Sequence, residues 1–157
     1  MHKLEHGGAS RETDELAAVD RANHSSGVAR FEDVELEPAS FDLITSCISL
    51  HHVSDKGLLY ERLAAAIRPG GTFRFADQLR GGTDANHEHN WRRWLEFCRR
   101  PGHCDEFEIE SLLDHARAHD HYTPLVEHFA LLERAGFSSP DCVWRNWIWG
   151  IVTTESR

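Results

Sequence analysis

Hydrophobic and polar residues alternate along the chain with periods that change from strand-like to helix-like. Residues 41–48 form a near-continuous apolar run, which is typical of a strand covered on both faces. Apolar residues then recur at helical spacing from 59 to 67, and Pro69-Gly70-Gly71 ends that helix. A β-rich segment, 72–77, follows. Strand, helix and strand together predict a right-handed βαβ unit with two parallel strands.

The second half of the chain is dominated by helical periodicity. Three segments place their apolar residues on one face: 86–100, 108–118 and 123–135. Two β-rich segments flanking Asn146 then close the chain. These elements predict an α/β fold with a mostly parallel sheet, a C-terminal antiparallel hairpin and a helical insertion at 81–124.

The pattern is weaker before residue 41. We expect residues 1–27 to be poorly ordered or helical, because they carry few apolar positions at a regular spacing. Residues 28–33 read as a short strand. The predicted domain therefore covers residues 28–157, and its length suffices for one buried core.

Composition narrows the range of partners. The formal net charge of −9 argues against nucleic acid or an anionic membrane as the main partner. No apolar run approaches the length of a membrane span, and the first residues lack the hydrophobic region of a signal peptide. The four cysteines show no Cys-x-x-Cys pair. Reduced thiols and a cytoplasmic location are the prediction.

Several short segments, in the same order, resemble the motifs of one enzyme family. They are Arg30-Phe31-Glu32-Asp33-Val34, Phe41-Asp42, Ser49-Leu50-His51-His52-Val53, Ile67-Arg68-Pro69-Gly70-Gly71, and 132–137 with 141–152. The family is that of the class I S-adenosylmethionine-dependent methyltransferases acting on small molecules. The resemblance covers residues 28–152. It implies a partial Rossmann-like fold in which these segments are the third strand, the fourth strand, the loop after it, the turn before the fifth strand, and the last helix with the closing hairpin.

The resemblance also implies a set of cofactor-binding residues. Asp33 would accept a hydrogen bond from the adenine amino group, with Val34 beside the ring. Ser46 and Cys47 would line the methionine and sulfonium region. In open α/β sheets ligands sit at the carboxyl ends of the strands, where all four residues fall. The structural alternatives are a turn cap for Asp33 and strand interior for Ser46 and Cys47.

Methyl transfer from a sulfonium is an in-line displacement, so it needs alignment more than covalent help. A base is required only where the acceptor must lose a proton. His51 and His52, at the mouth of the implied pocket, are the first candidates for this base, and Asp77 is a third. Capping and packing are the alternatives for the two histidines.

The insertion would cover the methyl acceptor, which the resemblance implies is a small molecule. Trp91, Trp94 and Tyr122 could line it as an aromatic wall. Trp91 and Trp94 lie at helical spacing, so packing in the core is the alternative for both of them.

The glycine-rich loop with which this family holds its cofactor has no counterpart in the chain. No Gly-x-Gly occurs anywhere, and no acidic residue ends a second strand. Losing two or three hydrogen bonds to charged groups, at about 1.5–3 kcal/mol each, would weaken binding about 10²–10⁵-fold. We therefore expect either an N-terminally truncated member or a family member rebuilt as a smaller domain, with little or no activity. The strand at 41–48 would have an open edge, through which the chain could self-associate.

Two alternatives come from other classes of protein. One is a methyltransferase-like domain that has lost catalysis and serves as a binding or scaffold module. The other is a histidine-rich metal-binding protein, since His115, His119 and His121 surround Asp120, with His103-Cys104 nearby. Because His-x₃-His spacing is common by chance in a histidine-rich chain, we expect no metal site.

Overall fold

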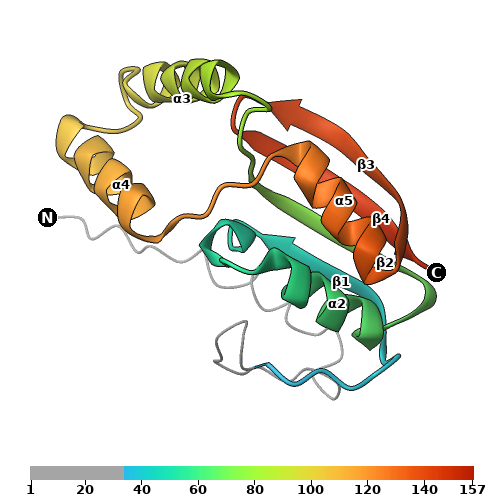
Figure 1. Cartoon of the computed structure of the whole chain (residues 1–157). Helices are drawn as coiled ribbons and strands as arrows, with labels where there is room; N and C mark the ends of the chain where they lie inside the picture. Colours follow the sequence, from blue (N-terminus) through green and yellow to red (C-terminus); the bar gives the residue numbers. More distant parts are fainter. Residues whose placement is uncertain (1–33) are drawn as a thin grey trace, which may run out of the picture. The chain divides into compact units, whose positions relative to one another are not determined.

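The computed structural model describes residues 34–157, which belong to one compact unit. Figure 1 shows their order along the chain. The elements are β1 (Phe41–Cys47), the 3₁₀ helix η2 (Leu50–His52), α2 (Lys56–Ala66), β2 (Ile67–Gln78), α3 (Asp84–Cys98), α4 (Glu106–His119), α5 (Leu125–Ala135), β3 (Phe137–Asn146) and β4 (Trp149–Ser156). The strand expected at 28–33 and the boundary expected between residues 27 and 28 lie outside the described residues.

The four described strands form one sheet in the order β1-β2-β4-β3. β1 and β2 run parallel, with Leu43 opposite Thr72 and Ile44 opposite Phe73, and α2 connects them. The predicted βαβ unit is therefore confirmed.

β4 is antiparallel to both of its neighbours, so the sheet is mixed. The expectation of a mostly parallel sheet is wrong for the described residues. β3 runs in the same direction as β2 and is connected to it through α3, α4 and α5. β4 follows β3 after a short turn, returns between these two strands and is antiparallel to both, so the predicted C-terminal hairpin is present.

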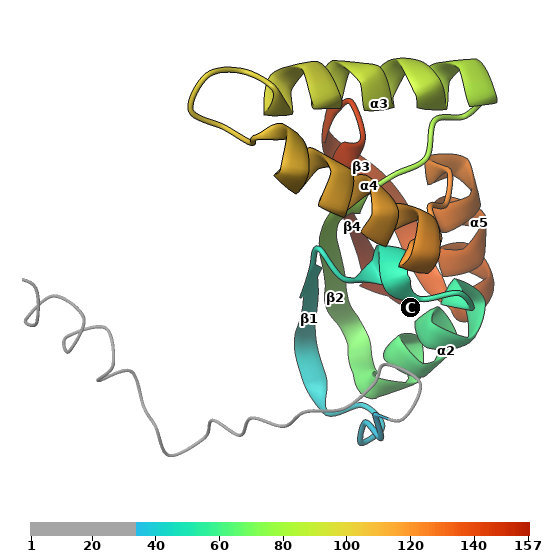
Figure 2. The ribbon, with the colours of Figure 1, turned by 90° about the vertical axis from the view of Figure 1, so that its left-hand side faces the viewer.

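The hydrophobic core lies between the sheet and two helices, α2 and α5, which cover one of its faces (Figure 2). Phe73 and Phe75 of β2 alternate with exposed or half-buried residues and point into this layer. Leu63 of α2, Leu132 of α5 and the β4 residue Val152 pack against them. Each fully buried side chain of this size contributes about 1.5–3 kcal/mol.

β1 is more exposed than its apolar sequence predicts. Phe41 and Leu43 are 38% and 52% exposed, so the expectation of a strand covered on both faces is wrong for this part of the chain. Among residues 34–157, β1 has a paired neighbour on one side only, which is β2. An apolar edge strand of this kind is a site for pairing with another chain.

The turn between α2 and β2 is tighter than expected. β2 begins at Ile67, directly after the helix, and runs through the Pro-Gly-Gly sequence. Gly70 has a φ of 78°, in the left-handed region that favours glycine. A Cβ on Gly71 would lie 2.9 Å from the carbonyl oxygen of Asp42. The glycines therefore allow β2 to approach the start of β1 closely.

Two helices occupy the segment between β2 and α5. Asp105 and Glu108 form a reciprocal capping box at the start of α4, and Thr83 caps α3. The chain then returns from α4 to the sheet through residues 120–124, where Arg80 and Pro124 form a β-bridge. Within residues 34–157, no helix combines the length and the apolar character that crossing a bilayer requires.

Candidate functional site

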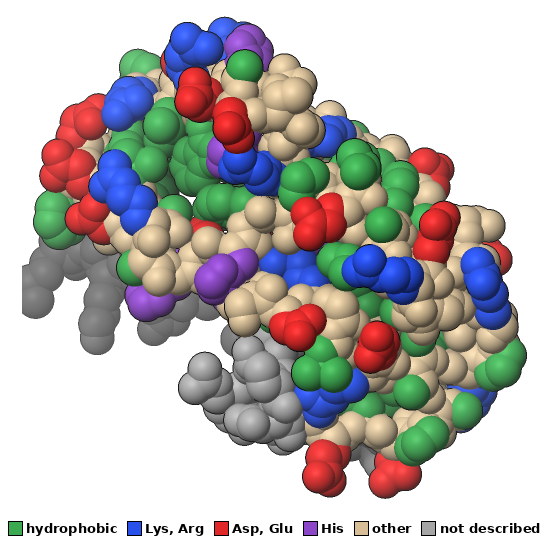
Figure 3. Space-filling model, viewed as in Figure 1, with side chains coloured by type: hydrophobic (Ala, Val, Ile, Leu, Met, Phe, Trp, Pro, Cys, Tyr) green, Lys and Arg blue, Asp and Glu red, His purple; other side chains and the backbone are tan. Residues whose placement is uncertain are grey.

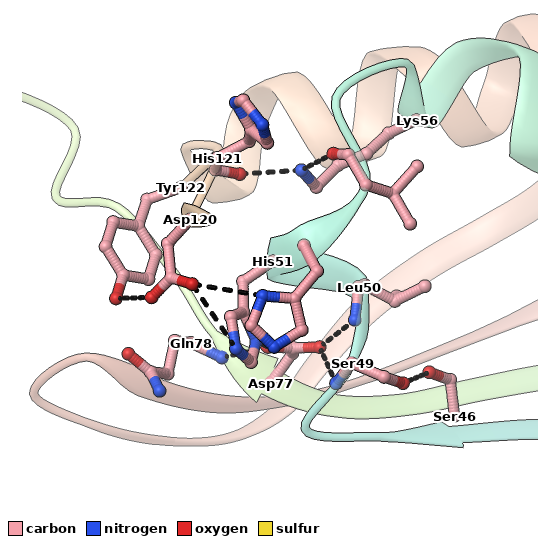
Figure 4. Close-up of polar contacts among 12 residues, drawn as sticks. Ser46, Ser49, Leu50, His51, Lys56, Asp77, Gln78, Asp120, His121 and Tyr122 are labelled. Carbon is pink, nitrogen blue, oxygen red and sulfur yellow. Dashed lines mark hydrogen bonds and ion pairs between the residues drawn. The ribbon is translucent and has the colours of Figure 1, made fainter. Parts of the chain in front are cut away.

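A buried carboxylate ties together the carboxyl ends of β1 and β2. Asp77, 1% exposed, lies at the end of β2. Its Oδ2 accepts hydrogen bonds from the backbone amides of Ser49 at 3.0 Å and Leu50 at 2.6 Å. Its Oδ1 accepts from the Gln78 amide at 2.6 Å and lies 2.5 Å from Nδ1 of His51. Figure 4 shows these contacts, which we name the Asp77 network.

The Asp77 network keeps the carboxylate ionised. Burial raises the pKa of Asp77, but hydrogen bonds from the His51 ring and from the backbone of Gln78 and Ser49, with the charge of His51, leave that pKa below its usual value. A carboxylate with every oxygen engaged and a lowered pKa is a weak base. The expectation that Asp77 accepts a proton from a substrate is therefore not supported by its geometry.

Ile48 has a strained backbone conformation, and the two residues after it donate their amides to the Asp77 carboxylate. Ile48, directly after β1, has a φ of 53°, which is rare for a β-branched residue. Its amide still pairs with Ala76 of β2 at 2.8 Å. The reversal at Ile48 turns the next two amides toward Asp77. Strain of this kind concentrates at functional sites, where the surrounding structure holds it in place.

Three side chains converge beyond the Asp77 network. Nε2 of His51 lies 3.9 Å from Oδ1 of Asp120, and Nδ1 of His52 lies 3.1 Å from the same oxygen. His51 is buried, whereas the His52 side chain is 42% exposed. Within residues 34–157, these three form the group whose ligand atoms could hold a metal ion. We name it the His51–His52–Asp120 cluster.

Aromatic rings extend from the cluster toward α3. The Tyr122 hydroxyl donates a hydrogen bond to Oδ2 of Asp120, and the Tyr122 ring stacks near His51 with centroids 6.2 Å apart. Trp91 lies 5.6 Å from Tyr122 and 5.0 Å from Trp94. In Figure 3 hydrophobic side chains gather in the recess between α3 and α4. The residues expected as an aromatic wall thus lie side by side.

A buried lysine holds the segment that carries Asp120. Nζ of Lys56 donates to the carbonyl oxygens of Val53 at 2.7 Å and His121 at 2.6 Å. The amide of His121 in turn donates to the carbonyl of His51 at 2.6 Å. Burial lowers the pKa of Lys56, and the charges of Asp77 and Glu127 oppose that shift. These contacts fix Asp120 opposite the two histidines.

The other predicted cofactor residues are distributed unevenly. Ser46 and Cys47 lie at the carboxyl end of β1, where the hydroxyl of Ser46 pairs with that of Ser49 at 2.8 Å and Cys47 is exposed. Val34 lines a cavity of about 340 Å³ beside β1 and α2, whose lining includes neither Ser46 nor Cys47. Asp33 lies outside the described residues.

The histidines expected as a metal set are only partly brought together. The rings of His115 and His119 are 4.9 Å apart, and His115 also lies 5.3 Å from His52. Figure 4 shows the His121 ring turned away from the Asp120 carboxylate. The His103 ring contacts Phe97. Of the residues in this expected set, Asp120 is the one that belongs to the His51–His52–Asp120 cluster.

Comparison with known proteins places these features in a wider context. Residues 9–75 match a family model described as a methyltransferase domain. An S-adenosylmethionine-dependent methyltransferase from Mesorhizobium loti is 16% identical, with 94% of this chain and 76% of that one covered and a TM-score of 0.56. A putative S-adenosylmethionine-dependent methyltransferase from Listeria monocytogenes is 10% identical. The match covers 96% of this chain and 77% of that one, with a TM-score of 0.58.

Human N-acetylserotonin methyltransferase, solved with S-adenosylmethionine, is 20% identical, with 82% of this chain covered and a TM-score of 0.51. This chain spans 32% of that enzyme, and no more than 42% of two further matching structures. At these identities the solved structures establish the fold. The family match ends at residue 75, two residues before Asp77.

Proposed function

We propose that this chain is a class I S-adenosylmethionine-dependent methyltransferase that transfers a methyl group from S-adenosylmethionine to a small molecule. The match of residues 9–75 to a methyltransferase-domain model and the similarity of the fold to solved methyltransferases support this proposal. The cofactor supplies an electrophilic methyl group on a sulfonium. The chain's own residues must align the acceptor with that group and remove any proton that the acceptor loses.

We propose that the described residues form the methionine end of the cofactor site. Cys47 is exposed at the carboxyl edge of the parallel pair β1 and β2, which is where ligands of open α/β sheets bind. We assign Ser46 and Cys47 to this end, and Asp33 and Val34 to the adenine end. Since the chain contains no Gly-x-Gly, we expect weaker binding than the glycine-rich loop would provide.

His51 is the proposed base. The observation that carries the proposal is the 2.5 Å contact between Nδ1 of His51 and Asp77. It holds the ring so that Nε2 points toward Asp120. A carboxylate partner stabilises an imidazole that takes up a proton. His52, which is more exposed, is proposed to contact the acceptor at the mouth of the site.

The aromatic wall supports an acceptor with a flat apolar surface. Trp91, Trp94 and Tyr122 form a continuous series of rings that ends 6.2 Å from His51. Offset and edge-to-face contacts with such rings are worth about 0.5–1.5 kcal/mol beyond the burial of area. An acceptor ring held there would present its reactive group to His51.

The proposal is tested by calorimetry with S-adenosylhomocysteine, followed by a transfer assay with radiolabelled S-adenosylmethionine and a panel of small aromatic amines and phenols. We expect weak binding, and transfer that is lost in His51→Gln but retained in the control His119→Gln, at the exposed end of α4. Absence of binding at about 1 mM ligand would refute the enzyme and leave a domain of this fold without catalysis.

We also propose that the chain associates with itself through β1 and acts in the cytoplasm. The exposed Leu43 on an edge strand supports the first statement, and four free cysteines support the second. The net charge of −9 supports a role without nucleic acid or membrane partners. Light scattering after size-exclusion chromatography should detect a dimer, and a monomer at all concentrations would contradict it.

A further inference from the structure

We propose that the His51–His52–Asp120 cluster binds a divalent transition-metal ion, with Zn²⁺ as the representative case. The cluster offers two imidazole nitrogens and one carboxylate oxygen, all within 4.8 Å of one another. Two histidines and a carboxylate are a ligand set that suits Zn²⁺ and other first-row divalent ions. The inference does not depend on the proposed transfer of a methyl group, because ion binding is measured without cofactor.

The distances agree with a single shared ion. Zinc bonds of about 2.0–2.2 Å at the tetrahedral angle place neighbouring ligand atoms about 3.3–3.6 Å apart. The contacts of the Asp120 oxygen with the two ring nitrogens, 3.1 Å and 3.9 Å, lie on either side of this range. Small side-chain rotations would therefore complete the site.

The Asp120 oxygen also lacks another partner. The Asp120 side chain is 4% exposed, yet its Oδ1 accepts no hydrogen bond from any described residue. The nearby His52 nitrogen does not direct a hydrogen at it. A buried carboxylate oxygen without a partner is costly. An ion between the three residues would remove that cost, and its charge would offset that of the carboxylate.

Outer contacts orient two of the three ligands. Nδ1 of His51 is engaged by Asp77, which leaves Nε2 free for the ion in the carboxylate–histidine–metal arrangement seen at many zinc sites. Oδ2 of Asp120 accepts from the Tyr122 hydroxyl, which leaves Oδ1 free. In both His51 and Asp120, the atom that faces the ion is therefore the one not engaged by the outer hydrogen bond.

Three protein ligands leave a position open for water or for a substrate oxygen. An ion on Nε2 of His51 takes the lone pair that would otherwise accept a proton. Bound metal and the proposed His51 base therefore exclude each other. In the loaded protein the ion would instead lower the pKa of an acceptor hydroxyl bound at the open position, and the proton would pass to water.

The test uses the full chain, stripped with a chelator and dialysed. Zn²⁺ is titrated in the calorimeter, and Co²⁺ is titrated by its visible absorption, which reports the coordination geometry. We expect one equivalent of tightly bound ion. Asp120→Asn and His52→Ala should each weaken Zn²⁺ binding more than about 100-fold, and Tyr122→Phe about 10–100-fold.

His119→Gln is the matched control, since it removes a neighbouring histidine but no proposed ligand. It should bind Zn²⁺ as the unchanged chain does. Equal affinity in Asp120→Asn, or loss in His119→Gln alone, would overturn the proposal in favour of a site on α4. Failure to bind Zn²⁺ or Co²⁺ at micromolar concentrations would also overturn it. Cofactor binding and methyl transfer could still be present in that case, so the two proposals fail separately.

Discussion

The Asp77→Asn substitution gives the sharpest test of how this edge of the sheet is assembled. Both carboxylate oxygens face N–H donors: the Ser49 and Leu50 amides on one side, and the Gln78 amide with the His51 ring on the other. An asparagine amide can accept on one side only. In one orientation its NH₂ group faces the Ser49 and Leu50 amides. In the other it faces the Gln78 amide and the His51 ring nitrogen that donates to the carboxylate.

The expected cost follows from those contacts. Hydrogen bonds to a charged group are worth about 1.5–3 kcal/mol each, so losing two removes about 3–6 kcal/mol. Part of this loss is offset, because the neutral asparagine avoids the free-energy cost of burying a charge. We expect a net loss of about 2–4 kcal/mol in the free energy of unfolding. That is a large share of the 5–15 kcal/mol typical of a domain.

The loss should depend on pH in one direction. The pKa of Asp77 is lowered in the folded protein. The stabilisation is therefore fully present above the unfolded pKa, about 3.9, and is lost as the pH falls through the lower folded pKa. The difference between the unchanged chain and Asp77→Asn should be constant above about pH 5 and should shrink below about pH 4.

The assay is urea unfolding followed by circular dichroism, with Asp55→Asn as the control. Asp55 caps α2 by accepting from the Leu58 amide, and asparagine is an equally good cap, so the control should unfold as the unchanged chain does. If Asp77→Asn is unfolded in buffer, the titration is run in sucrose, which strengthens the folded state. A loss below about 1 kcal/mol, or a difference at pH 3 as large as that at pH 7, would refute the reasoning.

Three further predictions concern other residues of the same fold. Burial lowers the pKa of His128 from 6.5 to about 4. Because the unfolded chain is protonated at a higher pH than the folded chain, the free energy of unfolding should fall by about 3 kcal/mol as the pH decreases from about 6.5 to about 4. Urea titrations of His128→Phe should lack that slope, and an unchanged slope would exclude His128 as its cause. Lys56→Met should destabilise the chain by about 1–3 kcal/mol, because two carbonyls lose their donor; no change in the urea midpoint would contradict this. Ile48→Gly should leave stability unchanged or raise it by up to about 1 kcal/mol, because the φ of 53° is relieved, and a clear loss would show that the turn is unstrained.

Local patterns account for the parts of the fold that could be predicted. The apolar run at 41–48, the helical spacing after it and the Pro-Gly-Gly turn all act within a few residues, so they indicate the βαβ unit without knowledge of the rest. Gly136 ends α5 with a φ of 107°, as its position after a helical pattern predicts. The start of β2 at Ile67 was missed, because glycine and proline normally interrupt a strand.

The site depends on contacts that such patterns do not contain. Asp120 is 69 residues from His51 in sequence, and it reaches the cluster because Lys56 and the His51 carbonyl hold residue 121. The histidine-rich stretch around Asp120 suggested a metal set of His115, His119 and His121, whereas the side chains that lie against the Asp120 carboxylate are those of His51 and His52. Asp77 was expected to face a substrate. Its actual role depends on the reversed backbone at Ile48, a conformation that isoleucine seldom adopts.

The Asp77 network spans residues 26 to 28 positions apart, which has a consequence for synthesis on the ribosome. Every group that this carboxylate contacts has been made by the time residue 78 emerges. The crossover unit can close on itself before α3 exists, since every partner of Asp77 lies within residues 49–78. Asp120 is synthesised later, and it is positioned when the Lys56 ammonium donates its second hydrogen bond, to the carbonyl of His121. The nascent chain should therefore form the two-stranded scaffold of β1 and β2 first and bring Asp120 to His51 and His52 last.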